Sequence, residues 1–326
     1  MTTNHDDRPH PIPAFAYLRY KENYFFVIMD PERHVFGLSH LNTEPIFNRT
    51  RFTLNLNVHG ERFAYANETP VPANFAMSSA LGDGKLSLRF VEPHGRFDLG
   101  FHDDDVELDV IFEARRPTFD FSACRTAAPD MPSFQEVLTL GLNLPFNHQQ
   151  QSLRTRGRVW LKSGRHRSPI ELDGWGYRDH SWVMRSDNVV RQHVWTGLNF
   201  PRRAFGMKTI ETLQRPGLWA KEGYVSDDDG ARALRSINVI RQGEKDGWPE
   251  KLQFEFRDAF DKPFTIEVDV AGRYSDVPLH SEKTLANQSQ YSIIETCCPL
   301  LHLETGEKGV GLVEIGKHPS LTTPTN

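Results

Sequence analysis

Cysteine is scarce in this sequence, and apolar residues never run long enough to cross a membrane as a helix. Only Cys124, Cys297 and Cys298 occur, and two of them are adjacent. A disulfide framework needs an even, spaced set, so we expect free thiols and a reducing, cytoplasmic compartment. No stretch of 18 apolar residues exists, which excludes a membrane-spanning helix. The polar, proline-rich amino terminus is unlike a secretory signal.

An excess of basic charge is also missing. The 326 residues carry 38 basic and 43 acidic side chains, a formal net charge of −5, whereas proteins that bind nucleic-acid backbones are usually basic. The phosphate loop, the dinucleotide-binding glycine pattern and the common zinc and hydrolase motifs are absent as well. We therefore expect no nucleic-acid partner, no cofactor and no metal ion.

Alternation of apolar and polar residues is the strongest pattern that the sequence does have. It recurs in the runs FTLNLNV from Phe52, KLSLRFVE from Lys85, DVELDVIFEAR from Asp105 and PFTIEVDV from Pro263. A period of two is typical of half-buried strands, and turn clusters such as GDG and SDDDG separate the runs. This predicts an all-β protein made of antiparallel sandwiches or barrels, with helix limited to residues 30–36 and 133–144.

The length suggests two β domains or one large all-β unit. A weak internal repeat supports two domains, because residues 95–117 and 254–275 share one pattern: a strand, an acidic turn and a second strand followed by arginine. The most natural boundary lies around PFNHQQQS, which gives an amino-terminal domain over 1–150 and a carboxy-terminal domain over 151–326.

The segment ELDGWGYRDHSWVMR, residues 171–185, differs from the rest of the chain. It is followed closely by RQHVWTGLNF, residues 191–200. A surface strand has no structural need for so many titratable and aromatic side chains in one place. The structural alternative is a buried tryptophan cluster in which Arg178 and Asp179 serve as paired ions.

The run Gly-Trp-Gly-Tyr-Arg-Asp-His-Ser-Trp, residues 174–182, resembles the signature of the AttH and carotenoid-hydratase (hydroxyneurosporene synthase) superfamily. NHQQQSLRTRGRVWL from Asn147 and GVGLVEIGKH from Gly309 support the resemblance, which covers most of residues 140–316. It implies two lipocalin-like (calycin) β-barrel domains packed together, with an apolar ligand cavity near the motif. It also implies site roles for Asp179, His180 and Trp182.

The sequence departs from that family at one point. In carotenoid hydratases a later Tyr-x-Asp pair accompanies the motif, but the matching strand, residues 205–213, holds neither residue, and only Glu211 offers a carboxyl group. This departure argues against carotenoid hydration as the reaction itself.

Strand geometry divides the motif between two faces. On a regular strand, Arg178, His180 and Trp182 point one way, whereas Trp175, Tyr177 and Asp179 point the other. We expect the face of His180 and Trp182 to line the cavity.

A second His-x-Trp spacing follows the motif at His193 and Trp195. If Asp187 and Asn188 form a two-residue hairpin turn, these two side chains join His180 and Trp182 in one patch. Chance juxtaposition of core aromatics is the alternative.

These residues favour cofactor-independent acid–base chemistry on an apolar terpenoid-, steroid- or polyketide-like molecule, as in a hydratase, dehydratase, isomerase or cyclase. The predicted catalytic groups are His180, Asp179 and Tyr177. The predicted substrate-binding residues are Trp182, His193, Trp195, Arg178, Trp175 and Glu211.

Two alternatives stay open. One is a lipocalin-like carrier that binds an apolar ligand without turning it over. The other is a metal site built from His180 and His193 with a carboxylate. A homo-oligomer is compatible with the sequence.

Overall fold

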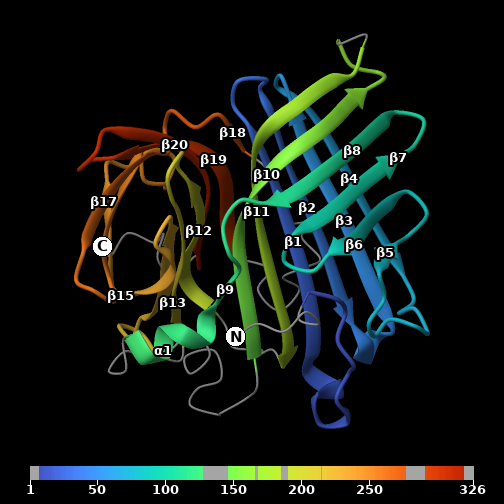
Figure 1. The fold of residues 1–326 in the computed structure, drawn as a ribbon, viewed down its shortest axis with the longest axis horizontal. Coiled ribbons are helices and arrows are strands. Elements are labelled where there is room, and N and C mark those ends of the chain that lie inside the picture. Colours follow the sequence, from blue (N-terminus) through green and yellow to red (C-terminus); the bar gives the residue numbers. More distant parts are fainter. Residues whose placement is uncertain are drawn as a thin grey trace. The chain divides into compact units, whose positions relative to one another are not determined.

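The computed structural model describes residues 7–127, 146–165, 168–184, 190–213, 215–276 and 291–318. Strands dominate this part of the chain (Figure 1), and the prediction of an all-β protein with little helix is confirmed. The helical elements described are η1 (Ala14–Arg19), η2 (Pro45–Phe47), η3 (Phe121–Ala123) and α1 (Cys124–Ala127). Among the described helices, none has the length and apolar character needed to cross a bilayer.

The chain divides into two compact units. The first takes its described residues from 1–120 and 145–185, and the second takes them from 121–144 and 186–326. This division differs from the expected cut at residue 150, which falls inside strand β10 (Phe146–Leu161). Because β10 pairs along its length with strands of the first unit, the motif at residues 174–182 belongs to that unit and not to a carboxy-terminal domain.

The first unit is an antiparallel sheet that curls into a half-barrel. Its strands follow the order β4-β3-β2-β1-β11-β10-β8-β7-β6-β5, with β9 paired to β10. Besides β10, the strands are β1 (Tyr20–Asp30), β2 (Val35–Glu44), β3 (Arg49–Val58), β4 (Glu61–Thr69), β5 (Ala80–Gly82), β6 (Leu86–Glu92), β7 (Arg96–His102), β8 (Val106–Ala114), β9 (Phe119–Asp120) and β11 (Ile170–Met184).

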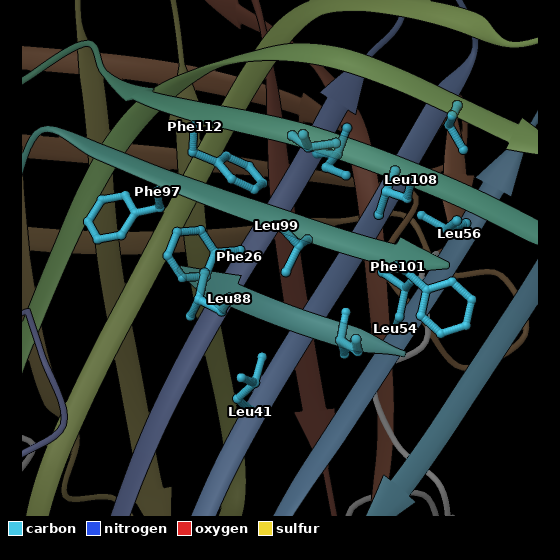
Figure 2. Packing of buried hydrophobic residues seen from close by; sticks show 14 of the residues in the cluster. Phe26, Leu41, Leu54, Leu56, Leu88, Phe97, Leu99, Phe101, Leu108 and Phe112 are labelled. Carbon is cyan, nitrogen blue, oxygen red and sulfur yellow. The ribbon is translucent and has the colours of Figure 1, made fainter. Parts of the chain in front are cut away.

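Alternation along the strands builds the core of this unit. Figure 2 shows Phe26 of β1 beside Leu88 of β6, Phe97 of β7 and Phe112 of β8, which belong to the same buried cluster. The even-numbered residues of β1 supply this face, because successive side chains of a strand point to opposite sides. The even-numbered side chains of β1 include Glu22, upstream of Tyr24 and Phe26. The Glu22 carboxylate therefore lies on the same face of β1 as the core aromatic residues.

The second unit is a closed antiparallel barrel. Its sheet has the order β17-β16-β15-β14-β13-β12-β20-β19-β18, and it closes because β17 also pairs with β19. The strands are β12 (Val190–Asn199), β13 (Ala204–Thr212), β14 (Ala220–Asp227), β15 (Gly230–Gln242), β16 (Lys251–Asp258), β17 (Pro263–Asp269), β18 (Ser275–Asp276), β19 (Ser292–His302) and β20 (Glu307–Lys317).

Each alternating run named above forms a strand, namely β3, β6, β8 and β17. The two echoing segments form the hairpins β7–β8 and β16–β17. The helix expected over 30–36 is wrong, since β1 and β2 pair up to Asp30 and Val35 and leave only a tight turn between them. The helix expected over 133–144 lies outside the described residues.

All three cysteines are buried and unbridged, which agrees with the expectation of free thiols. Burial raises the pKa of Cys298 to about 12 and that of Cys297 well above its usual value, so neither is ionised at neutral pH. Since the thiolate is the reactive form, we expect Ellman's reagent to leave native protein almost unlabelled and to titrate three thiols in guanidinium chloride. Rapid labelling of a native thiol would contradict this assignment.

Candidate functional site

Strands β1 and β11 bring the site together. They pair antiparallel, with Glu22 opposite Trp182 and Tyr24 opposite His180. Side chains at directly opposed positions stand on the same face of a sheet. The resulting cluster lies on the core face of the first unit, where Phe26 and Ile28 continue the stripe of β1. A polar group is thereby embedded at the end of an apolar core.

Glu22 is the centre of the cluster and is fully buried. Its Oε1 lies 2.7 Å from His10 Nδ1 and 2.9 Å from His180 Nε2, and it accepts a 2.9 Å hydrogen bond from the Tyr24 hydroxyl. Its Oε2 accepts hydrogen bonds of 2.7 Å from the Tyr20 hydroxyl and 3.0 Å from the His10 backbone N–H. Burial acts to raise the pKa of Glu22, but the bonds from His10 and His180 outweigh it and bring the pKa to about 2. Glu22 is therefore an anion at neutral pH.

This anion fixes the protonation of His180. An ionised carboxylate can only accept hydrogen bonds, so His180 Nε2 carries the proton that it shares with Glu22. Burial lowers the pKa of His180 below its ordinary 6.5, so the ring is neutral at pH 7 and its Nδ1 has a free lone pair. Among the described residues, Nδ1 has no hydrogen-bond partner. His180 is thus a buried base whose second nitrogen is held by a carboxylate.

Gln149 of β10 stands directly opposite His180 on the other side of β11. Its side chain is fully buried, yet neither its amide nitrogen nor its amide oxygen has a partner in the described part of the chain. Buried polar atoms almost always have a partner in the protein or in bound water or ligand. The Gln149 amide can therefore hydrogen-bond an oxygen-bearing group, and His180 Nδ1 can take up or return a proton.

Aromatic rings hold His180 in place. Its ring stacks on Tyr24 at 4.2 Å and on Trp182 at 4.5 Å between centroids, and His10 stacks on Trp182 at 4.3 Å. Stacked rings restrict the rotation of the imidazole, and indole faces stabilise positive charge where water is excluded. The arrangement suits an imidazolium that forms transiently.

Arg178 has a structural role on the same face. Its Nη1 lies 2.7 Å from Asp7 Oδ1 with both side chains buried, and its Nε donates a 2.7 Å hydrogen bond to Gln151. The guanidinium also lies 4.7 Å from the centre of the Phe97 ring. The structural alternative, in which Arg178 and Asp179 are paired ions, is not what these contacts show, because Arg178 pairs with Asp7 and adjacent residues of a strand point to opposite faces.

Tyr177 and Asp179 belong to a separate network on the other face of β11. The Tyr177 hydroxyl donates to Gln150 Oε1 at 2.7 Å, and Gln150 Nε2 donates to Asp179 at 2.9 Å. Asp179 also forms a close hydrogen bond with His148. The predicted division of the motif between two faces is therefore seen in the contacts. On that face Trp175 packs under Arg115, whose guanidinium carbon lies 4.3 Å from the ring centre.

His193 and Trp195 do not join the cluster by the expected hairpin. Both sheet neighbours of β11 are strands of the first unit, β1 and β10, whereas β12 pairs with β13 and β20. His193 instead contacts the Tyr291 hydroxyl at 2.6 Å and Glu314 at 2.5 Å, and Trp195 lies opposite Lys208 and Glu314 in the register.

Glu211 pairs with Arg191 at 2.7 Å and accepts from Gln192 at 2.7 Å. It belongs to β13 of the second unit. The alternative metal site from His180 and His193 required β11 and β12 to be adjacent strands. They are not neighbours in the sheets, so nothing supports that site.

Another set of side chains has the composition of a metal site. His10, Glu22 and His180 each offer one ligand atom, and these atoms lie within 4.8 Å of one another. Two imidazoles and one carboxylate suit zinc or iron. Both imidazoles, however, hydrogen-bond to the same carboxylate oxygen, and each oxygen of Glu22 accepts at least two donors. A cation would have to displace these donors, so we describe the group as a hydrogen-bonded network.

The sequence alone did not single out five residues of this cluster, namely Glu22, His10, Tyr20, Tyr24 and Gln149. One signal was present, since YKENYFFVI places a glutamate on the same alternating stripe as two tyrosines, a phenylalanine and an isoleucine. A carboxylate on a buried stripe needs dedicated partners, which makes it a candidate functional group.

Solved structures with the same fold come from proteins of very different sequence. A putative AttH from Nitrosomonas europaea superposes with a TM-score of 0.63 at 11% identity, over 92% of this chain and 93% of that one. Kievitone hydratase from Nectria haematococca gives 0.59 at 12% identity, over 95% and 90% of the two chains. CghA in complex with Sch210972 gives 0.58 at 8% identity, over 91% and 88%.

These likenesses confirm the expected AttH-like, lipocalin-like fold. No curated protein matches the sequence. A family model described as a domain of unknown function, DUF7064, matches residues 3–319. Because this match covers nearly the whole chain, the protein is a member of the DUF7064 family.

Proposed function

We propose that this protein is a cofactor-independent acid–base enzyme that removes water from, or adds water to, an apolar small molecule. The observation that supports this best is the free Nδ1 lone pair of His180, a neutral buried imidazole backed by the ionised Glu22. A carboxylate behind an imidazole stabilises the imidazolium that forms when the ring takes a proton.

A dehydration can proceed through this one base. His180 Nδ1 takes a proton from the carbon next to the hydroxyl-bearing carbon, and the electron pair of that C–H bond forms the new double bond. The C–O bond breaks, and the leaving hydroxyl accepts the proton from Nδ1 and departs as water. The Gln149 amide N–H binds the oxygen throughout. Hydration is the same path in reverse, and it restores neutral His180.

The surroundings fit an apolar substrate. The His180 ring stacks on Tyr24 and on Trp182, Trp182 stacks on His10, and the core stripe of β1 continues from the cluster. Aromatic faces stabilise the imidazolium that forms when His180 takes the proton, by about 1–2 kcal/mol each when water is excluded. Two structural neighbours act on or bind small molecules by their names, kievitone hydratase and CghA with Sch210972, which supports a ligand of similar size.

The proposal is tested by looking for a ligand and then for oxygen exchange. Native mass spectrometry of gently purified protein is expected to show a co-purified small apolar molecule. That molecule, together with kievitone as a probe, is then incubated with the protein in ¹⁸O-labelled water. We expect ¹⁸O in the hydrated product, and a His180→Gln variant should lose this label incorporation.

Two outcomes would reject a cofactor-independent enzyme. A ligand that binds stoichiometrically, without exchange of oxygen or of carbon-bound hydrogen in D₂O, would establish a carrier instead. Stoichiometric zinc or iron, with activity lost on chelation and restored by the ion, would show that His10, Glu22 and His180 act as metal ligands.

A further inference from the structure

Exposed apolar side chains gather at one place in the first unit. Phe15, Leu18 and Phe47 are 69%, 74% and 61% exposed, and Tyr17 and Ile46 are also exposed. These five are half of the ten large hydrophobic residues with exposed side chains in the described residues. They come from only two short helices, η1 and η2. We call them the η1–η2 patch.

The two helices form one continuous surface. The Tyr17 hydroxyl of η1 donates to the carbonyl oxygen of Pro45 in η2 at 3.1 Å. Asn48 ends η2 in a left-handed conformation with φ 47°, which turns the chain sharply into β3 and leaves Phe47 at the tip of the turn. The apolar side chains therefore project from turns, where no core element covers them.

The opposite side of η1 covers the candidate site. Ala16 is fully buried in a cluster with Tyr20 and Trp182, and His10, just upstream, stacks on Trp182. One side of η1 is therefore buried against the candidate site, and the other side exposes apolar side chains. Since soluble proteins seldom expose large apolar side chains in groups, this grouping indicates an interaction surface.

The rim of the patch is basic. Within two residues of the ends of η1 and η2, the charged residues are Arg19, Lys21, Arg49 and Glu44, which is three cations against one carboxylate. Glu44 is buried and is already paired with Lys21 at 2.9 Å and with Arg49 at 2.5 Å. The guanidinium carbon of Arg49 also lies 4.6 Å from the centre of the Phe47 ring. The rim keeps a net positive charge beside the exposed aromatics.

We propose that the η1–η2 patch docks onto the surface of an anionic lipid bilayer. Aromatic and aliphatic side chains on short turns insert to the depth of the headgroups, and arginine and lysine at the rim attract anionic lipid. A tyrosine with an apolar ring and a polar tip suits the same interface. A protein partner would need a broader surface than two such short helices provide. The proposal does not depend on the enzymatic one, because it concerns binding alone.

The experiment is co-sedimentation of the full chain with vesicles of phosphatidylcholine, with and without phosphatidylserine. We expect binding to the mixed vesicles that weakens as salt is raised. A Phe15→Ser/Phe47→Ser double variant should bind them on the order of 30-fold more weakly, since each buried aromatic contributes strongly to partitioning. An Arg19→Gln variant should lose about fivefold on mixed vesicles and little on phosphatidylcholine alone.

The matched control is Phe260→Ser, because Phe260 is 81% exposed but lies outside the patch, between β16 and β17. It should bind vesicles like the parent protein. All these side chains are exposed, so circular dichroism and thermal unfolding should stay unchanged. The proposal is overturned if the double variant and the parent bind equally. It is also overturned if sedimentation equilibrium shows a dimer that Phe15→Ser dissociates, because a second copy is then the occupant.

Discussion

Replacing His180 by glutamine is expected to lower turnover about 100-fold or more, with little change in substrate affinity. Glutamine keeps a similar size and can still donate a hydrogen bond to Glu22, but it has no basic nitrogen to take a proton. Loss of a group that acts only in the transition state lowers kcat and leaves KM nearly constant. Steady-state kinetics on the ligand found by native mass spectrometry would measure both constants.

The pH profile of the parent protein tests the same base. Burial holds the pKa of His180 below 6.5, and proton abstraction requires the neutral ring. Activity is therefore expected to be constant above about pH 6.5 and to fall at lower pH as the imidazole becomes protonated. A profile that rises toward acid pH would contradict the assignment of His180 as the base.

The control for this prediction is Asp179→Asn. Asp179 is adjacent in sequence but lies on the other face of β11, where it contacts His148 and Gln150. We expect its replacement to change stability rather than turnover. If Asp179→Asn abolishes turnover in a folded protein while His180→Gln does not, the acid–base pair is Tyr177 and Asp179, and the active face is the opposite one.

The second large effect is expected for stability at Glu22. Replacing this residue by alanine leaves Tyr20, Tyr24, His10 and His180 without their common acceptor in a buried place. Removing one partner of such a network typically costs about 3–5 kcal/mol. We therefore expect a large drop in the melting temperature of the first unit, measured by calorimetry at pH 7.

The pH dependence of stability follows from the same carboxylate. The pKa of Glu22 is about 2 in the folded protein, against 4.5 for an ordinary glutamate. Because the folded value is the lower one, the ionised carboxylate stabilises the fold above pH 4.5, and this contribution is lost as the pH falls from 4.5 toward 2. The difference corresponds to about 3 kcal/mol at neutral pH.

Urea unfolding at pH 7 and pH 3 would measure this loss. A Glu22→Gln variant should lose less stability than the parent between the two pH values, since it has no carboxylate to protonate. The matched control is Glu171→Gln, an exposed glutamate of β11, which should behave like the parent. An equal acid sensitivity of the parent and of Glu22→Gln would show that another group governs acid unfolding.

The fold class could be predicted from the sequence because the alternation of buried and exposed residues in a strand is visible within a short run of the chain. The run from Phe52 and the run from Pro263 each show the period of two that becomes β3 and β17. The division of the motif between two faces followed from the same local rule, and it placed His180 and Trp182 together, apart from Asp179.

Strand order and register are decided by tertiary structure. From the sequence we expected β12 to pair with β11, because the two follow each other in the chain. In the sheet the neighbours of β11 are β1 and β10. Sequential strands are often neighbours, so the hairpin was the natural expectation. The expected domain boundary at residue 150 differs from the structure for the same reason. No local sequence pattern shows that β10 and β11 belong to the first sheet.

Sequence alone determined the all-β class, the free thiols, the motif and the face on which His180 stands, because all of these depend on residues near one another in the chain. Only the tertiary structure decided which side chain hydrogen-bonds to His180. Glu22 lies 158 residues away, and it meets His180 because β1 pairs with β11 in one particular register. A shift of that register by one residue would turn Glu22 to the opposite face, since side chains alternate along a strand.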